Sequence, residues 1–233
     1  MTRTIRVALG TFIGGFLIEA GTEIYQLLSY GVREPGWIGL YYVGLAATGV
    51  GFYLMYRGRH EWTDEHRKNV RQGHRLLGAA IAMFVGAFLV IALLGIWRGG
   101  RNGPNPSAAL AWVVGGLVTV SFGNFFLSLA ILVDRITGRL GRFMAWGGFG
   151  WSLGVAVLTG YLVGGEFLSL LDEFFTNPLA LAVSFAPLAF VIAPLFVSYL
   201  LFAGAYAQAL HRLRKVTIPP TTGAAAPPSD RTA

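Results

Sequence analysis

Residues 7–30 form an apolar segment that carries two carboxylates, and this combination constrains the chain more than any other feature. Glu19 and Glu23 are four residues apart, so on a helix their side chains lie one above the other on the same face. Ionised carboxylates are costly in lipid, and a membrane helix therefore turns them toward other helices or a wet cavity. The segment predicts a helix packed within a bundle.

The polar side chains of this segment fall within an arc of about 120° when the helix is projected at about 100° per residue. The polar and small members of the arc are Thr11, Gly15, Glu19, Thr22, Glu23, Gln26, Ser29 and Tyr30. Ala8 and Phe12 share the arc, so it is not purely polar. The opposite side is lined by Ile13, Phe16, Leu17, Ala20, Ile24 and Leu27.

Composition places the whole chain in the membrane class. Of the 233 residues, 55% are hydrophobic and only 12% are charged, whereas a soluble domain carries about 25% charge. The formal net charge is +7, but the basic residues stand in short clusters between long apolar runs, which is a topology pattern and predicts no nucleic-acid partner. The absence of cysteine excludes disulfides, thiolate metal sites and cysteine nucleophiles.

The pattern of apolar runs predicts an all-α polytopic bundle of about six transmembrane helices in a single domain, residues 1–215. The expected spans are residues 7–30, 37–56, 76–97, 108–133, 143–163 and 179–207. Residues 57–75 are interpreted as a charged hairpin loop, and the Pro/Ala/Thr-rich residues 216–233 as a disordered tail. The first run follows two arginines, as a signal peptide does, but it lacks a small-x-small cleavage site, so we expect an uncleaved span.

The distribution of Lys and Arg predicts the orientation. With six spans, 15 of these residues fall on the side that holds both termini and 3 on the other. Because basic loops stay in the cytoplasm, we expect both termini to be cytoplasmic, in a prokaryotic plasma membrane. Spans one to three and four to six would then have inverted topology, and whether they form a true repeat stays open.

Glu19 and Glu23 are the leading candidates for a functional site. Two carboxylates one helical turn apart in a low dielectric repel each other, so the pair should hold a proton or share a cation. Two structural alternatives remain: the carboxylates reach the outer headgroups, or they hydrogen-bond Asn124 or other polar neighbours and hold helices together.

Three further residues are weaker candidates. Asn124 repeats with Ser121 and Ser128 on one helix face, where such residues more often join helices than bind ligands. Pro187 and Pro194 are seven residues apart, on one face of the last span, where they predict a kink that lets this helix move.

Enzyme and cofactor signatures are missing from the sequence. His60 and Asp64 could bind a metal, but no H-E-x-x-H spacing is present, and we expect no metal there. No histidine or lysine lies in an expected span, which disfavours a haem held by two intramembrane imidazoles and excludes a retinal-type Schiff base. No nucleotide-binding or acyl-transfer motif occurs, so we expect no enzyme activity and no cofactor.

The sequence therefore leaves two hypotheses from different classes. The first is a small transporter or channel that moves a proton, a cation or a small solute past Glu19, Glu23 and Asn124. The second is a non-catalytic structural or assembly subunit whose Gly- and Trp-rich spans pack against other membrane proteins. Beyond the lipid bilayer, the expected partners are such membrane proteins or further copies of the chain.

Overall fold

The computed structural model describes residues 3–29, 35–62, 64–98, 108–165 and 192–215. Within these residues it contains six α-helices and one short 3-10 helix, so the all-helical class is confirmed. The helices are α1 (Arg3–Leu28), α2 (Pro35–Arg57), the 3-10 helix η1 (Gly58–Glu61), α3 (Asp64–Arg98), α4 (Ala108–Asp134), α5 (Arg139–Gly165) and α9 (Leu195–Lys215).

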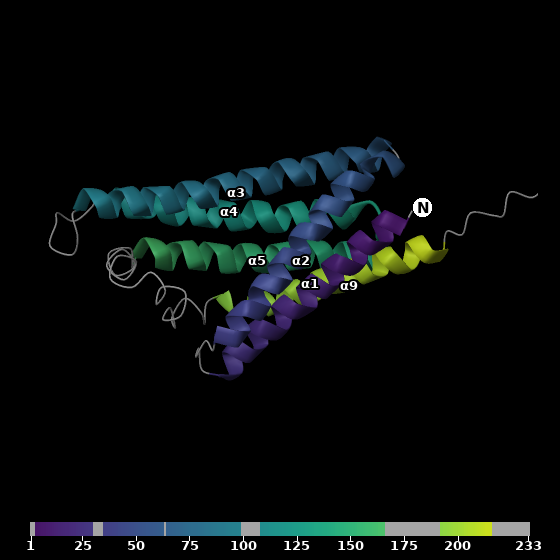
Figure 1. Cartoon of the computed structure of the whole chain (residues 1–233), viewed down its shortest axis with the longest axis horizontal. Helices are drawn as coiled ribbons and strands as arrows, with labels where there is room; N and C mark the ends of the chain where they lie inside the picture. The colour runs from purple at the N-terminus through teal and green to yellow at the C-terminus, as the bar shows by residue number, and fades with distance from the viewer. Residues whose placement is uncertain (1–2, 30–34, 63, 99–107, 166–191, 216–233) are drawn as a thin grey trace, which may run out of the picture.

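The helices pack as a series of neighbours. The extensive contacts join α3 to α4, α4 to α5, α5 to α9, α9 to α1, and α1 to α2. Figure 1 shows α3, α4 and α5 running side by side, with α1, α2 and α9 crossing them at an angle. The first residues of α1 and the last residues of α9 lie at the same end of the molecule (Figure 1).

Four helical stretches among the described residues are long and apolar enough to cross a membrane. They are Arg3–Leu28, His66–Leu94, Ala109–Asp134 and Arg139–Gly165. Helices α2 and α9 correspond to the second and sixth expected spans but are not among these four. The described part of α2 carries four tyrosines, and α9 ends in Gln208, His211 and the basic residues that follow.

Most of the described residues in the charged stretch 57–75 are helical, so the prediction of a hairpin loop was wrong. The chain continues from α2 into η1 and then enters α3 at Asp64, so that α3 is 35 residues long. Lys, Arg, Glu and Gln are good helix formers, and the charge of the first three does not prevent helix formation in water. The end of the charged stretch coincides with the start of the apolar part of α3, at about Leu76. The helix itself begins earlier, at Asp64.

The end of the expected sixth span is a helix that begins just after Pro194. Ala193 and Pro194 form a turn in which their carbonyls accept hydrogen bonds from the amides of Phe196 (3.0 Å) and Val197 (3.2 Å). Proline has no amide hydrogen to donate, and it is well tolerated next to a helix start. Pro187 and the expected tail 216–233 lie outside the described residues.

An aromatic core joins the two groups of helices. Phe12 of α1 packs against Phe52 of α2 (ring centroids 5.2 Å apart) and Tyr206 of α9 (4.8 Å). Phe202 of α9 stacks on Phe126 of α4 at 6.0 Å. Aromatic pairs at these separations add stability beyond their buried area, so α9 is held on both sides.

Helices α1 and α2 cross closely because each has a glycine at the contact. A Cβ atom on Gly44 would lie 2.8 Å from Cγ of Glu19 and 3.2 Å from the carbonyl oxygen of Gly15. A Cβ atom on Gly15 would lie 2.7 Å from the Oγ1 atom of Thr48. Close approach through small residues is a common way to pack membrane helices, and here it presses Glu19 against α2.

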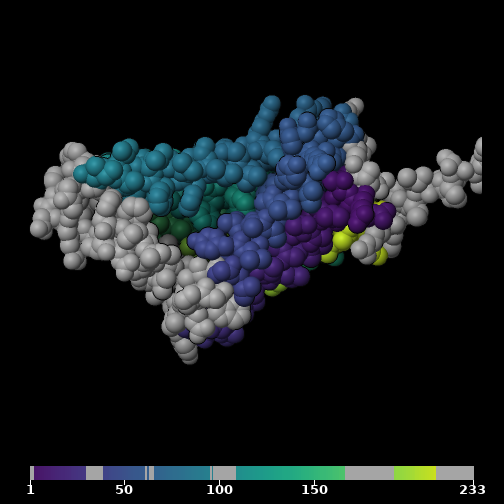
Figure 2. Space-filling model, in the orientation of Figure 1, coloured from purple at the N-terminus to yellow at the C-terminus, as the bar shows by residue number. Residues whose placement is uncertain are grey.

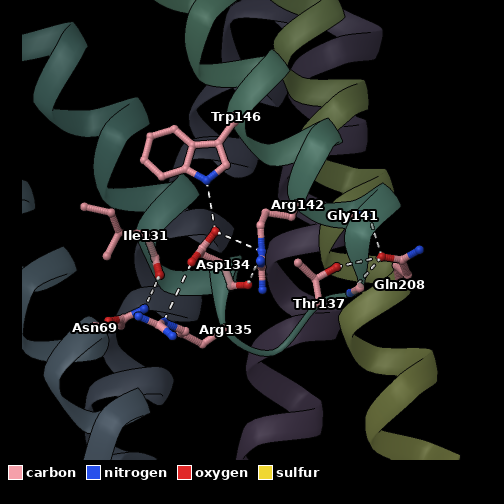
Figure 3. A network of polar contacts seen from close by, with 10 residues as sticks. Asn69, Ile131, Asp134, Arg135, Thr137, Gly141, Arg142, Trp146 and Gln208 are labelled. Atoms are coloured by element: carbon pink, nitrogen blue, oxygen red, sulfur yellow. Dashed lines mark hydrogen bonds and ion pairs between the residues drawn. The ribbon is translucent and has the colours of Figure 1, made fainter.

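A single side chain fixes the start of α5 to α9 (Figure 3). The Oε1 atom of Gln208 accepts hydrogen bonds from the amides of Gly138 (3.1 Å) and Gly141 (2.6 Å) and from the hydroxyl of Thr137 (2.7 Å). The first amides of a helix have no partner within the helix itself. Gln208 therefore caps α5 from a helix that is distant in sequence.

Replacing Gly44 by Ala should destabilise the protein by about 1–3 kcal/mol, because the new methyl group overfills the α1–α2 contact. The matched control is Gly49→Ala on the same helix, where a Cβ would meet nothing within 4 Å. Its free energy of unfolding should be unchanged or slightly higher. Denaturant unfolding of the detergent-solubilised protein measures both changes, and equal values for the two variants would contradict this account of the crossing.

Candidate functional site

The polar face of α1 is buried. Glu19 is 1% exposed and Glu23 is 2% exposed, and Thr22 and Gln26 on the same face are also buried. Leu17 and other apolar side chains on the opposite face are exposed. The inward orientation predicted for the polar arc is thus found for these residues, because α2 and α9 cover this face of α1.

Phe16 and Ala20 depart from the expected division of α1 into two sides. Both were assigned to the side opposite the polar arc, and both are buried. Phe16 contacts Phe202 and Tyr206 of α9, with ring centroids 5.8 and 5.3 Å apart. A helix covered by two neighbours buries more of its circumference than one arc, so α9 takes up part of the apolar side.

Glu19 is hydrogen-bonded across the α1–α2 crossing. The hydroxyl of Thr48 donates to its Oε1 atom at 3.5 Å, a long hydrogen bond, and Thr48 is completely buried. The Oε2 atom of Glu19 is buried and has no hydrogen-bond partner among the described residues. A buried carboxylate whose second oxygen is unpaired is costly unless a proton, a cation or water satisfies it.

Two tyrosines complete the surroundings of the glutamates. Tyr199 of α9 lies close enough to Tyr41 of α2 and to Glu19 and Glu23 to interact with all three side chains. Tyr199 is itself buried. We refer to Glu19, Glu23, Thr48, Tyr41 and Tyr199 as the carboxylate site, which three helices build together.

Other polar groups extend this site along α1. The hydroxyl of Thr22 donates to the backbone carbonyl of Glu19 at 2.8 Å, and so it is satisfied within the helix. Gln26, almost one turn beyond Glu23, is buried, and its Nε2 donor has no partner among the described residues. The buried face therefore carries both an unpaired acceptor and an unpaired donor, which is rare in packed protein interiors.

Asn124 belongs to a different contact. Its Nδ2 atom approaches the sulfur of Met83 on α3 at 3.6 Å, and neighbouring Ser121 donates to the carbonyl of Ala80 at 2.7 Å. These bonds join α4 to α3. They are the helix-joining arrangement that the sequence favoured for these residues, and they do not bring Asn124 together with Glu19.

Pro194 lies at a junction between α5 and α9. The indole nitrogen of Trp151 donates to the carbonyl of Pro194 at 2.8 Å, and the hydroxyl of Ser198 donates to the carbonyl of Gly148 at 3.0 Å. The first turn of α9 is therefore tied to α5. Pro187, the other predicted kink residue, lies outside the described residues.

The histidines of the charged stretch lie apart from the carboxylate site. The ring nitrogens of His74 lie 2.8 Å from the carbonyl of Val70 and 2.9 Å from that of Phe52, and this contact joins α3 to α2. His66 is buried with its ring centroid 3.9 Å from that of Trp62. The described residues contain no group of three or more His, Cys, Asp or Glu residues that could hold a metal ion.

Thr48, Tyr41 and Tyr199 were not identified as site residues from the sequence. Each is an isolated polar group in an apolar run, where threonine and tyrosine are common and carry no spacing signal. Only a fold that brings α2 and α9 onto the polar face of α1 distinguishes them from the other tyrosines and threonines.

Comparisons of the chain with protein-family models, with curated proteins and with solved structures found no match in any of the three. Any function must therefore be argued from the geometry of this chain.

Replacing Thr48 by Val keeps the shape of the side chain but removes the donor to Glu19. We expect the free energy of unfolding to fall by about 1–3 kcal/mol, because a buried acceptor loses its partner. Thr11→Val is the control on α1, since Thr11 donates to the carbonyl of Val7 at an exposed position. The control should change stability by about 0.5 kcal/mol or less, and a similar loss in both variants would remove the special role of Thr48.

Proposed function

We propose that the chain is a small integral membrane transporter or channel that moves a proton or a small cation by exchange at Glu19 and Glu23. The observation that carries this proposal is the pair of carboxylates buried at one helix face, with no hydrogen-bond partner for Oε2 of Glu19 in the part of the chain that the structure describes. Two carboxylates so placed repel each other in a low dielectric, and a proton or a cation between them relieves the repulsion.

The chemistry of the carboxylate site favours a singly charged ion or a proton. Its groups are carboxylates and hydroxyls. Carboxylates can take up a proton, and both groups are hard oxygen ligands for alkali cations. A divalent metal in a protein is usually bound by more than two acidic or imidazole ligands, and this site has only two carboxylates. The close α1–α2 crossing at Gly44 also favours a small ion over a bulky solute.

The proposed membrane orientation rests on the basic residues. The exposed basic side chains of the described helices stand near the start of α1, the end of α2, the start of α3, the α4–α5 junction and the end of α9. In Figure 1 the start of α1 and the end of α9 lie at one end of the molecule. We infer that this end faces the cytoplasm of a prokaryotic cell, with both termini on that side.

The contacts of α9 suggest which elements move during transport. Trp151 and Ser198 tie the first turn of α9 to α5, and Gln208 ties the other end of α9 to the start of α5. We propose that α5 and α9 move together relative to α1 and α2. The interaction of Tyr199 with Tyr41 and the ring contacts of Phe12 and Phe16 with α9 span the boundary between these two pairs and would have to rearrange when the pairs move.

Proteoliposomes that contain Glu19→Gln or Glu23→Gln protein should show proton or cation flux lowered by about tenfold or more, with an altered pH dependence. The physical reason is that an amide cannot exchange a proton or balance a cation. Thr11→Val, at a surface position of the same helix, should keep the flux of the original protein. Unchanged flux in both glutamate variants would reject the transporter proposal.

One observation favours the alternative, a non-catalytic subunit of a membrane complex. In the apolar 18-residue stretch that qualifies α3 as a candidate span only 11% of the residues are buried, against 39–50% in the corresponding stretches of α1, α4 and α5. The exposed side chains of α3 include Ile81, Phe84, Leu89, Leu93 and Ile96. Figure 2 shows α3 along one edge of the molecule, where partner helices as well as lipid would fit.

The subunit alternative makes the opposite prediction for the glutamates. It predicts specific membrane-protein partners in a mild-detergent pull-down and tolerance of both Glu→Gln exchanges. Substitution of Leu89 and Leu93 by Ala should then release the partner without lowering the stability of the isolated chain. Recovery of the chain alone, together with flux that depends on Glu19, would contradict this alternative.

A further inference from the structure

The junction of α4 and α5 carries two arginines that are held in place by one carboxylate. The Nε atom of Arg142 lies 3.4 Å from Oδ1 of Asp134, and the Nε atom of Arg135 lies 3.9 Å from Oδ2. Nε of Arg142 also donates to the backbone carbonyl of Asp134 at 3.3 Å. Figure 3 shows Asp134 between the two guanidinium groups.

Both guanidinium groups remain accessible. The side chain of Arg135 is 60% exposed and that of Arg142 is 51% exposed, whereas that of Asp134 is 22% exposed. Their contacts with Asp134 use the Nε atoms, which leaves the terminal NH2 groups of both arginines to bind another anion. Two cations on one carboxylate leave a net positive charge, and exposed Arg139, one turn before Arg142, adds to it.

An aromatic ring is fixed at the same place. The indole nitrogen of Trp146 donates to Oδ1 of Asp134 at 2.9 Å, so the carboxylate positions this ring as well as the arginines. Nearby Phe143 is 74% exposed and Trp146 is 42% exposed. The arginine pair lies beside exposed aromatic rings, at the end of a helix that could cross a membrane. The arginines match the phosphate of a phospholipid, and the rings match its acyl chains.

We propose that Arg135 and Arg142 bind the phosphate of an anionic phospholipid whose acyl chain lies along Trp146 and Phe143. Guanidinium groups recognise phosphate through paired, charge-assisted hydrogen bonds. Asp134 fixes the geometry of the arginines before the lipid arrives, which reduces the entropy lost on binding. This site is separate from the carboxylate site, and its existence does not depend on the transport proposal.

The test measures lipid binding to the full-length protein in detergent by native mass spectrometry. Phosphatidylglycerol, phosphatidylcholine and soluble glycerol 3-phosphate are added in separate titrations. The original protein should bind phosphatidylglycerol in preference to the other two. The double variant Arg135→Gln/Arg142→Gln should bind it about 30-fold more weakly, as expected for two basic residues at a membrane surface.

The control is Arg71→Gln/Arg75→Gln on α3, which removes the same charge from two other exposed positions. It should retain most of the phosphatidylglycerol affinity. All four positions are exposed, so folding should be preserved, and circular dichroism checks this. Equal losses in the two double variants, equal binding of phosphatidylcholine, or equal binding of glycerol 3-phosphate would each overturn the proposal.

Discussion

Two carboxylates in an apolar chain are unfavourable when they face lipid. The packing of α2 and α9 on α1 removes them from that environment. Glu19 and Glu23 cannot face lipid without a large penalty, so the face of α1 that carries them must be covered. Helix α2 can cover it closely only because Gly15 and Gly44 lack side chains at the crossing. Helix α9 closes the other side with Tyr199.

Ser121 and Thr119, polar residues in the rest of the bundle, have hydrogen-bond partners on neighbouring helices. The hydroxyl of Ser121 donates to the carbonyl of Ala80, and that of Thr119 donates to the carbonyl of Ala156, so each is satisfied by a neighbouring helix. Satisfied bonds of this kind hold helices together and demand no ligand. Glu19 and Gln26 differ because each has a buried polar atom without a hydrogen-bond partner in the described helices. Unpaired atoms, rather than polarity as such, separate a candidate site from structural contacts.

The polar arc of α1 could be predicted from the sequence because helical periodicity places Glu19, Glu23 and Gln26 on one face whatever their neighbours are. Which residues meet that arc could not be predicted, since Thr48 and Tyr199 are 29 and 180 positions from Glu19 and only tertiary packing selects them. Residues 57–75 were misread for a different reason. Their charge indicates solvent exposure, but it does not decide between a loop and a helix.

Helix α9 connects the carboxylate site to the end of the molecule where the arginines lie. Tyr199, near its start, contacts the surroundings of Glu19 and Glu23, whereas Gln208, more than two turns later, caps α5 beside the α4–α5 junction. Helix α9 is also bonded to α5 at Ser198, so a shift of α9 would disturb its contacts with α5 at both ends. A change in the charge of the buried glutamates would therefore act on α5 through α9, and Arg142, Trp146 and the lipid proposed there lie on the same helix. Ion exchange at one site and lipid binding at the other would then be coupled through a single rigid pair of helices.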